Sequence, residues 1–324
     1  MDVQRTSDGA EAELSAASAA PHGEENPLAP SNLFRHVQDA EFFHVPKVLD
    51  FDGMRDGHIY LPQFRGEEPV VRIQTGAAVI DNMIQPFNLR LTKFMALEVV
   101  AGLIVIALFT WVAHKIKTGE RPRGRMWNLL EAMLLFIRDQ VARPAIGKHD
   151  ADRYLPFLWT LFFFILACNL LGMIPWAGSP TSALAVTGML AIICLAVSIG
   201  SGMAKLGAVG YWKAQMPDID LPFVLGPLKI MIFFIEVLGT LIKHFVLAIR
   251  LFANMMAGHM VLGVLTAFVA VAWAVNVWVF AGVAPVAIAG ATALSLLELF
   301  VAFLQAYIFV FLASLFIGMA VHPH

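Results

Sequence analysis

The chain has 324 residues, of which 59% are hydrophobic and 14% are charged, and its formal net charge is −2. Soluble domains are about 45–50% apolar and about 25% charged, so this composition excludes an ordinary soluble protein and predicts one embedded in a membrane. The near-balance of charge gives no reason to expect nucleic acid or an anionic surface as a partner.

The first 90 residues are predicted to lie outside the membrane. Residues 1–30 are acidic, rich in alanine and serine and broken by three prolines, which is typical of a disordered lead-in. Arg5 is their only lysine or arginine and they have no apolar core, so they are neither a secretory signal nor an arginine-rich transit peptide. Residues 31–90 hold short apolar stretches between turn signals, which predict an extramembrane or interfacial segment with short strands. Membrane entry would then depend on the spans of residues 91–324, as in a bacterial inner-membrane protein.

The first predicted span runs from Phe94 to Lys115. It ends in KIKTGERPRGR, which carries five of the twenty-two Lys and Arg residues. The positive-inside rule puts this loop in the cytoplasm and the N-terminus outside. Residues 126–144 follow, with apolar residues at helical spacing and charges between them, which favours a helix lying in the interface.

Two further spans are predicted, at about Tyr154 to Pro175 and Ser182 to Met203. The loop between them, WAGSP, has no charge, as expected outside the cell. Lys205 and Lys213 follow the second of these spans. They predict an amphipathic connector on the cytoplasmic side.

The rest of the chain holds two apolar segments that are too long to cross a membrane upright. Residues 228–272 contain no proline and no turn cluster. As one helix they would be about 70 Å long, against a hydrocarbon core of about 30 Å. Residues 285–321 would also form a helix longer than the hydrocarbon core is thick. The uncharged residues 273–284 are predicted to join the two segments as a loop. We therefore predict an all-α integral membrane protein with five to six hydrophobic helical segments, two of them long, oblique and antiparallel, and a cytoplasmic C-terminus.

Polar residues recur at intervals of seven in both long segments: Glu236, Lys243 and Arg250 in the first, and Glu298 and Gln305 in the second. Seven residues at about 100° each return nearly to the same helix face. Asn254 lies one turn past Arg250 on that face. A charge at mid-span costs at least about 2.5–3.5 kcal/mol, so such residues persist where they line water or meet a partner.

An antiparallel pairing brings His259 and Glu298 to nearly the same level. His259 is nine residues past Arg250, and Glu298 is seven residues from Gln305, in both cases toward the connection between the segments. With Arg250 and Gln305 level, the other two differ by about 3 Å along the axis. The polar groups then form an outer acid–imidazole pair, a central arginine and an inner acid, Glu236.

This order of groups suits the transfer of protons. Glutamate and histidine titrate near neutral pH after modest shifts, whereas arginine, with a pKa above about 12, stays charged. A permanent cation between two aqueous paths blocks a proton from passing straight through. No second acid lies near Arg250 in the sequence, so we expect its carboxylate partner on another subunit.

Plainer interpretations remain open for these residues. Arg250 would otherwise form a salt bridge within the chain, with Glu298 or Glu236. Asn254 and Gln305 would otherwise serve as hydrogen-bonding contacts between helices.

Neither a metal nor a cofactor is expected. His259 and Glu298 have no evident third ligand. Cys168 and Cys194 lie within apolar stretches and are typical of small core residues. His244, in the first long segment, is typical of an interfacial or satisfied core histidine.

The stretch RLFANMMAGH, residues 250–259, closely resembles the arginine motif of the F-type ATP synthase a subunit, the stator partner of the rotating c-ring. LELFVAFLQAYIFVFL, residues 297–312, resembles the last helix of that family. NLLGMIP (169–175) and SPTSALAVT (179–187) resemble its two middle motifs. The resemblance covers roughly residues 90–320.

The resemblance implies that Arg250 faces the c-ring and attracts its essential carboxylate. It also implies that Glu236 belongs to a cytoplasmic half-channel, and that His259 and Glu298 belong to an outer one. Many bacterial members carry the acid first and the histidine second, so the pair is exchanged here.

Other positions agree with the family in part. Asn254 and Gln305 match polar positions of its motifs. Ala183 and Ala185 stand where members often have acidic or amide residues, which is a departure in the third span.

The function that the resemblance implies is proton translocation coupled to rotation and ATP synthesis. The implied partners are the c-ring, the subunit b stator, protons and the lipid bilayer of a bacterial inner membrane. No GK[ST] nucleotide motif is present, so we expect no enzyme activity from the chain by itself. Two other classes remain: a subunit of a redox-driven pump or an independent transporter, and a membrane scaffold whose charges hold partners together.

Overall fold

The computed structural model describes residues 42–44, 58–60, 92–117, 124–174, 178–215 and 226–322. The predicted disordered lead-in, residues 1–30, lies outside the described residues, as does most of segment 31–90. Within that segment, β1 (Phe42–His44) and β2 (His58–Tyr60) pair antiparallel. Two short strands are therefore present within this segment.

All the other elements described are helical. In chain order they are α4 (Lys93–Lys117), α5 (Arg125–Phe136), the π-helical turn η3 (Ile137–Ala142), α6 (Arg143–Ile146), α7 (Ala151–Gly172), the 3-10 turn η4 (Pro180–Ser182), α8 (Leu184–Leu206), α9 (Ala208–Ala214), α10 (Gly226–Val275) and α11 (Val277–Val321). Five of them, namely α4, α7, α8, α10 and α11, are long and apolar enough to cross a membrane. The prediction of an all-α membrane protein is confirmed.

The predicted interfacial helix, residues 126–144, is formed by α5, η3 and α6. Its apolar side is buried, with Ile137 and Val141 in the core. On its outer side Asp139 accepts hydrogen bonds from Arg138 at 3.0 Å and from Arg143 at 2.8 Å. The hydrogen bond from Arg138 holds the pKa of Asp139 below its usual value. Three of the charges that interrupt the apolar pattern, Arg138, Asp139 and Arg143, therefore pair with one another outside the core.

The connection between the two long helices differs from the prediction. The expected loop at residues 273–284 is wrong, because Asn276 is the one residue between the end of α10 and the start of α11. The Asn276 side chain accepts a hydrogen bond from the Trp278 backbone N–H at 3.2 Å and so caps α11. Pro285, which the prediction takes as the start of the last helix, lies inside α11. A proline is tolerated in a membrane helix where its surroundings satisfy the freed backbone groups.

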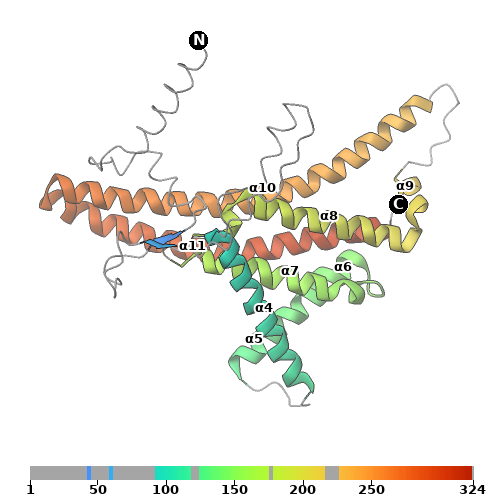
Figure 1. Cartoon of the computed structure of the whole chain (residues 1–324), viewed down its shortest axis with the longest axis horizontal. Helices are drawn as coiled ribbons and strands as arrows, with labels where there is room; N and C mark the ends of the chain where they lie inside the picture. Colours follow the sequence, from blue (N-terminus) through green and yellow to red (C-terminus); the bar gives the residue numbers. More distant parts are fainter. Residues whose placement is uncertain are drawn as a thin grey trace, which may run out of the picture.

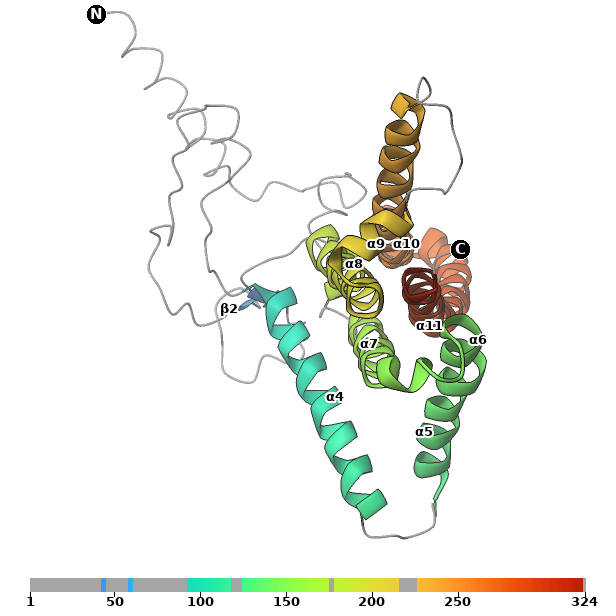
Figure 2. The same ribbon diagram turned by 90° about the vertical axis from the view of Figure 1, so that its right-hand side faces the viewer.

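The long helices set the shape of the molecule. With 50 and 45 residues, α10 and α11 are about 75 Å and 68 Å long. Figure 1 shows them side by side, with α7 and α8 running in a similar direction and α4 crossing that direction steeply. Figure 2 looks nearly along α7, α8 and α11 and shows α4 lengthwise. The bundle of α7, α8, α10 and α11 and the helix α4 therefore cannot all stand upright in one membrane.

The apolar core lies around α11, which packs against α7 and against α10. Leu158 and Ile165 of α7, Leu247 and Leu251 of α10 and Phe309 of α11 are all almost completely buried in one cluster. This core holds the middle of α10 in place, and Arg250 lies beside its two leucines.

The ends of three helices are joined at one point. Asp150, which precedes α7, forms a short ion pair with Lys205 of α8, and His322 at the end of α11 places Nε2 3.2 Å from the same carboxylate. The hydrogen bond from Lys205 lowers the pKa of Asp150. The start of α7 and the ends of α8 and α11 therefore lie on the same side of the protein.

Gly318 allows α11 to approach α6 closely. A methyl group there would overlap the backbone carbonyl oxygen of Ala145, which cannot rotate away. In contrast, a methyl group on Gly200 of α8 would meet no atom within 4 Å.

We therefore predict that Gly318→Ala destabilises the protein by about 1–3 kcal/mol, the usual cost of overpacking. The Gly200→Ala variant, which gains helix propensity without a clash, serves as the matched control. The measurement is the free energy of unfolding in mixed detergent. Equal stability of the two variants would contradict the close packing of α11 on α6.

Candidate functional site

Arg250 lies at the edge of the buried face of α10. Its neighbours Leu247 and Leu251 are buried in the core, whereas Arg250 is half-buried. In the part of the chain that the structure describes, its guanidinium group makes no ion pair or hydrogen bond. The salt bridge to Glu298 or Glu236, which is the plainer interpretation of Arg250, is absent there.

The helix face beside Arg250 is open. Asn254, one turn on, is exposed, and so are Lys243 and Glu236 at seven-residue spacing. Only 17% of the most apolar stretch of α10 is buried, against 56% for α7. Large apolar side chains such as Ile242 are exposed on this helix as well. This chain alone therefore leaves much of α10 free to contact lipid or another subunit.

His259 and Glu298 face each other between α10 and α11. His259 Nδ1 lies 3.1 Å from Glu298 Oε1, and the two side chains are only 14% and 6% exposed. The distance fits an ion pair, but Glu298 Oε1 has no partner at hydrogen-bonding geometry, and neither has His259 Nε2. Buried polar atoms of this kind are normally satisfied by protein or water. Each residue of the pair therefore has one buried atom that lacks a hydrogen bond, which a water molecule would supply.

Gly258 makes room for this pair. A Cβ atom at position 258 would lie 2.8 Å from Glu298 Oε1 and 3.1 Å from its carboxyl carbon. Any larger residue would therefore press on the carboxylate that contacts His259. The glycine that the motif places next to the histidine has a specific steric role.

The two middle motifs of the sequence meet in a buried network of hydrogen bonds. Thr181 donates to the Asn169 side chain at 2.8 Å and lies 2.8 Å from the Ser179 hydroxyl. Asn169 in turn donates to the backbone carbonyl of Ala302 at 3.2 Å. Ala302 lies on α11 between Glu298 and Gln305, which are both buried. The network therefore fixes the part of α11 that carries them.

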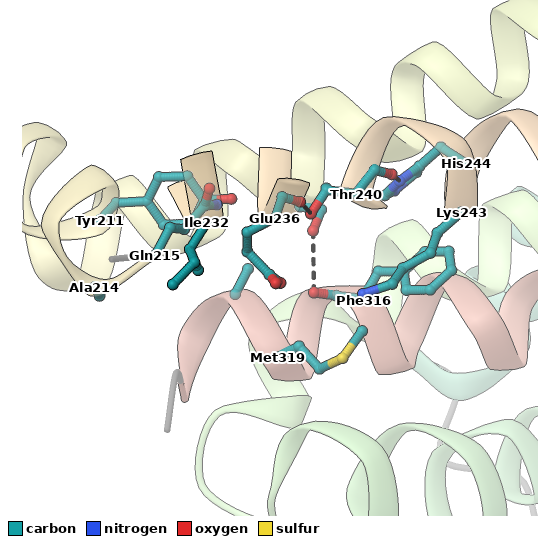
Figure 3. A pocket seen from close by; sticks show the side chains of 12 residues that line it. Tyr211, Ala214, Gln215, Ile232, Glu236, Thr240, Lys243, His244, Phe316 and Met319 are labelled. Carbon is teal, nitrogen blue, oxygen red and sulfur yellow. Dashed lines mark hydrogen bonds between the residues drawn. The ribbon is translucent and has the colours of Figure 1, made fainter. Parts of the chain in front are cut away.

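A cavity of about 350 Å³ opens between α8, α9, α10 and α11 on the other side of Arg250. Figure 3 shows the Glu236 side chain in it, between Gln215 and Phe316. The residues that line it are Ser198, Tyr211, Ala214, Gln215, Ile232, Glu236, Thr240, Lys243, His244, Phe316, Met319 and Ala320. Glu236 therefore lies beside a space that is large enough for several water molecules.

The structure brings some of the predicted site residues together and keeps others apart. His259 and Glu298 are in contact, whereas Glu236 lies in the separate cavity and Arg250 lies between the two along α10. Among the described residues, no three side chains of the metal-binding types come close enough to hold an ion.

Sequence reasoning misses the contribution of α9 to the cavity. Tyr211 and Gln215 come from the connector after α8, which the sequence identifies only as amphipathic. Their position against α10 depends on the tertiary fold, and no spacing rule relates them to Glu236. The buried position of His244 is equally a product of packing.

Comparison with known proteins agrees with the architecture and the motifs. A family model described as ATP synthase A chain matches residues 95–318, which is more than half of the chain. The chain belongs to the ATP synthase A chain family. The matched region runs from α4 to α11 and contains each of the predicted site residues.

Relatives named ATP synthase subunit a are similar over most of the chain. The protein from Myxococcus xanthus (strain DK1622) is 42% identical over 241 residues, which cover 73% of this chain and 76% of that protein. The protein from Anaeromyxobacter sp. (strain Fw109-5) is 34% identical over 305 residues, 90% of this chain and 70% of that protein. The protein from Chloroherpeton thalassium (strain ATCC 35110 / GB-78) is 36% identical over 282 residues, 86% of this chain and 78% of that protein. These relatives and the five apolar helices indicate a multi-pass bacterial membrane protein.

We predict that Gly258→Ala separates His259 from Glu298, because the added methyl group occupies the place of the carboxylate. In a structure of the variant, the distance from His259 Nδ1 to Glu298 Oε1 should exceed about 4 Å, the limit for an ion pair.

Gly290→Ala is the matched control, because its added methyl group would make only an ordinary contact of 3.8 Å with Leu265. An unchanged distance in Gly258→Ala would show that the pair does not depend on this glycine.

Proposed function

We propose that this chain is the proton-translocating a subunit of an F-type ATP synthase, in which Arg250 separates two aqueous half-channels that lead to and from a carboxylate of the c-ring. The coarser part of this proposal, a membrane subunit of the proton-translocating Fo sector, follows from the family. The finer part depends mainly on one observation, the unpaired guanidinium of Arg250 on an open helix face.

The argument from Arg250 is electrostatic. A charge inside a membrane costs at least about 2.5–3.5 kcal/mol unless water or a partner compensates it. Within the described residues, no acidic side chain pairs with Arg250, whereas Glu298 on the neighbouring helix pairs with His259. A carboxylate carried by a different subunit satisfies the charge and can also leave, as rotation requires.

The other polar groups divide into two sets on either side of Arg250. The outer set is the pair of His259 and Glu298, nine residues along α10 or about 14 Å away. The inner set is the cavity beside Glu236, fourteen residues or about 21 Å away in the other direction. Two polar regions on either side of a fixed cation favour two half-channels over one continuous pore.

The proposed cycle uses each set once. A proton enters through the outer path past Glu298 and His259, and protonates a ring carboxylate that has left Arg250. The neutral acid then moves through lipid as the ring turns. When a carboxyl group returns to the inner path, it loses its proton toward Glu236, and the new carboxylate is attracted to Arg250. Asn254 and Gln305 supply hydrogen bonds close to that exchange.

The orientation is proposed from the distribution of charge. Lys205 and Lys213 lie at the ends of α8 and α9, on the side of the Glu236 cavity. By the positive-inside rule, we propose that this side faces the cytoplasm. The C-terminus is then cytoplasmic as well, and residues 1–90 lie outside, with residues 91–324 as the membrane domain of a bacterial inner-membrane protein. If α4 crosses the membrane upright, then α10 and α11 lie oblique to it, as their lengths require.

Exposed apolar surface remains for other partners. Val99, Leu103 and Ile106 of α4 are exposed, and we propose that lipid and the subunit b stator cover such surfaces. The covalent chemistry of ATP synthesis takes place elsewhere in the complex, so the proposed role of this chain is transport.

A membrane scaffold is the second candidate, in which the charge of Arg250 would only hold partners together and would not be needed for proton transfer. We predict that Arg250→Gln and Arg250→Lys leave the complex assembled but reduce proton-driven ATP synthesis below about 1% of wild type, a loss of about 2.7 kcal/mol or more in the coupled step. The measurement is ATP synthesis by purified complexes in vesicles under an imposed proton gradient.

Lys229→Gln is the control, since it removes another cation from the same helix. It should retain synthesis. Normal synthesis by an assembled Arg250→Gln complex would refute the proposed function and favour the scaffold.

A further prediction concerns the outer pair. Glu298→Gln and His259→Leu should each slow proton flux about tenfold, the effect of about 1.4 kcal/mol on a barrier, because each removes one titratable group. The double exchange of His259→Glu with Glu298→His keeps one acid and one imidazole. It should carry protons faster than either single variant. If both single variants conduct at the wild-type rate, the outer path does not run through this pair.

A further inference from the structure

His244 of α10 lines the same cavity as Glu236, which lies on the inner side of Arg250. His244 is only 2% exposed, and its ring lies 4.5 Å from the ring of Phe316 on α11, centroid to centroid. Its Nδ1 lies 2.9 Å from the backbone carbonyl oxygen of Thr240. The imidazole is therefore held on both sides, by α11 and by its own helix.

These contacts determine which ring nitrogen is free. A carbonyl oxygen only accepts hydrogen bonds, so the proton of the neutral ring is on Nδ1 and is donated to Thr240. Nε2 then carries a lone pair, and it is buried without any hydrogen-bond partner. Such an atom normally has a partner, which is often an ordered water molecule.

A second residue that lines the cavity also has a buried polar atom without a partner. The side-chain oxygen Oε1 of Gln215, at the end of α9, is also buried without a hydrogen-bond partner. The two residues that carry these buried atoms both line a cavity of about 350 Å³, and one water molecule takes about 30 Å³ of liquid volume. Water entering from this cavity would give each of these atoms its missing partner.

We propose that His244 is a further proton-carrying residue of the inner path, which takes a proton onto Nε2 and releases it to water in the cavity. This inference rests on the proposed function, because it needs a proton flux through the inner cavity. Among the residues of α10 that line the cavity, His244 is the nearest to Arg250, six residues or about 9 Å away along the axis. Glu236 lies eight residues the other way.

The proton balance of the step is simple. A proton leaving the ring carboxyl reaches Nε2 through water and converts the imidazole to imidazolium, while Nδ1–H stays on the Thr240 carbonyl. The same Nε2 then gives a proton to the next water toward Glu236, and the ring returns to its neutral state. No other bond forms or breaks.

Few titratable side chains line the cavity with His244. Glu236 and Lys243 face the cavity from its own helix and Tyr211 faces it from α9, whereas α8 and α11 contribute only Ser198, Phe316, Met319 and Ala320. The carboxylate of Glu236 offsets the positive charges of Lys243 and of a protonated His244.

The test compares two substitutions of His244, each with and without imidazole, in the complete ATP synthase reconstituted in vesicles. His244→Ala should lower the proton flux about tenfold or more, since a lost proton carrier costs at least about 1.4 kcal/mol in the barrier. Imidazole added on the side of Glu236 should then restore the flux several-fold, because it enters the space that the ring has left. His244→Gln, which fills that space but cannot take up a proton, should be slow and should not respond to imidazole.

The packing control is Phe316→Ala. It enlarges the same cavity but keeps the histidine, so imidazole should not raise its flux. The proton flux of wild type with added imidazole shows how much of any change comes from imidazole acting as a buffer. A wild-type flux in assembled His244→Gln complexes, or no effect of imidazole on His244→Ala, would overturn the proposal. So would failure of His244→Ala, His244→Gln and His244→Asn alike to assemble, since the residue would then be required for packing.

Arg250→Gln is measured in parallel to separate the two proposals. If Arg250→Gln complexes are inactive while His244→Gln complexes conduct normally, only the role of His244 is wrong. If assembled Arg250→Gln complexes still synthesise ATP, the proposed function itself is wrong.

Discussion

The permanent positive charge of Arg250 within an apolar helix is the constraint on which the rest of the structure depends. Such a charge is stable in a membrane only if water or an opposite charge compensates it. The core residues Leu247 and Leu251 hold this part of α10 firmly, and the described part of the chain offers Arg250 no acid of its own. Among the described residues, Arg250 is thus a fixed cation without a partner on an open helix face. The proposed function follows if the carboxylate that pairs with it belongs to another, moving subunit.

The length of α10 is what makes two separate paths possible. A helix of 50 residues is more than twice as long as a bilayer core is thick, so groups on it can lie on both sides of the arginine and still reach water. The acid–imidazole pair of His259 and Glu298 occupies one side, where Gly258 gives the carboxylate its space. The cavity that holds Glu236 and His244 occupies the other. Both regions contain buried polar atoms without partners, which is the feature expected of places that water enters.

Much of the fold could be predicted from the sequence, because apolar length and the spacing of charges are local properties. The spans and the contact of His259 with Glu298 follow from helical periodicity and an antiparallel pairing. The connection at Asn276 could not be predicted in this way, because Pro285 suggests a helix start while the capping asparagine gives a weaker signal. The cavity could not be predicted from the sequence either, for a different reason. Tyr211 and Gln215 join Glu236 only through packing between α9 and α10, which no spacing in the sequence encodes. The roles of the site residues remain predictions.

The central claim is that Arg250 finds its partner on a moving subunit, and the distance between the two is the most direct test. In a structure of the assembled complex, the guanidinium of Arg250 should lie within about 4 Å of a ring carboxylate, or one water molecule away from it, in at least one rotational state. The His259–Glu298 pair and the Glu236 cavity should lie on opposite sides of that contact. A ring whose carboxylates pass Arg250 at more than about 10 Å, a distance at which exposed charges are largely screened, in every rotational state would contradict the account.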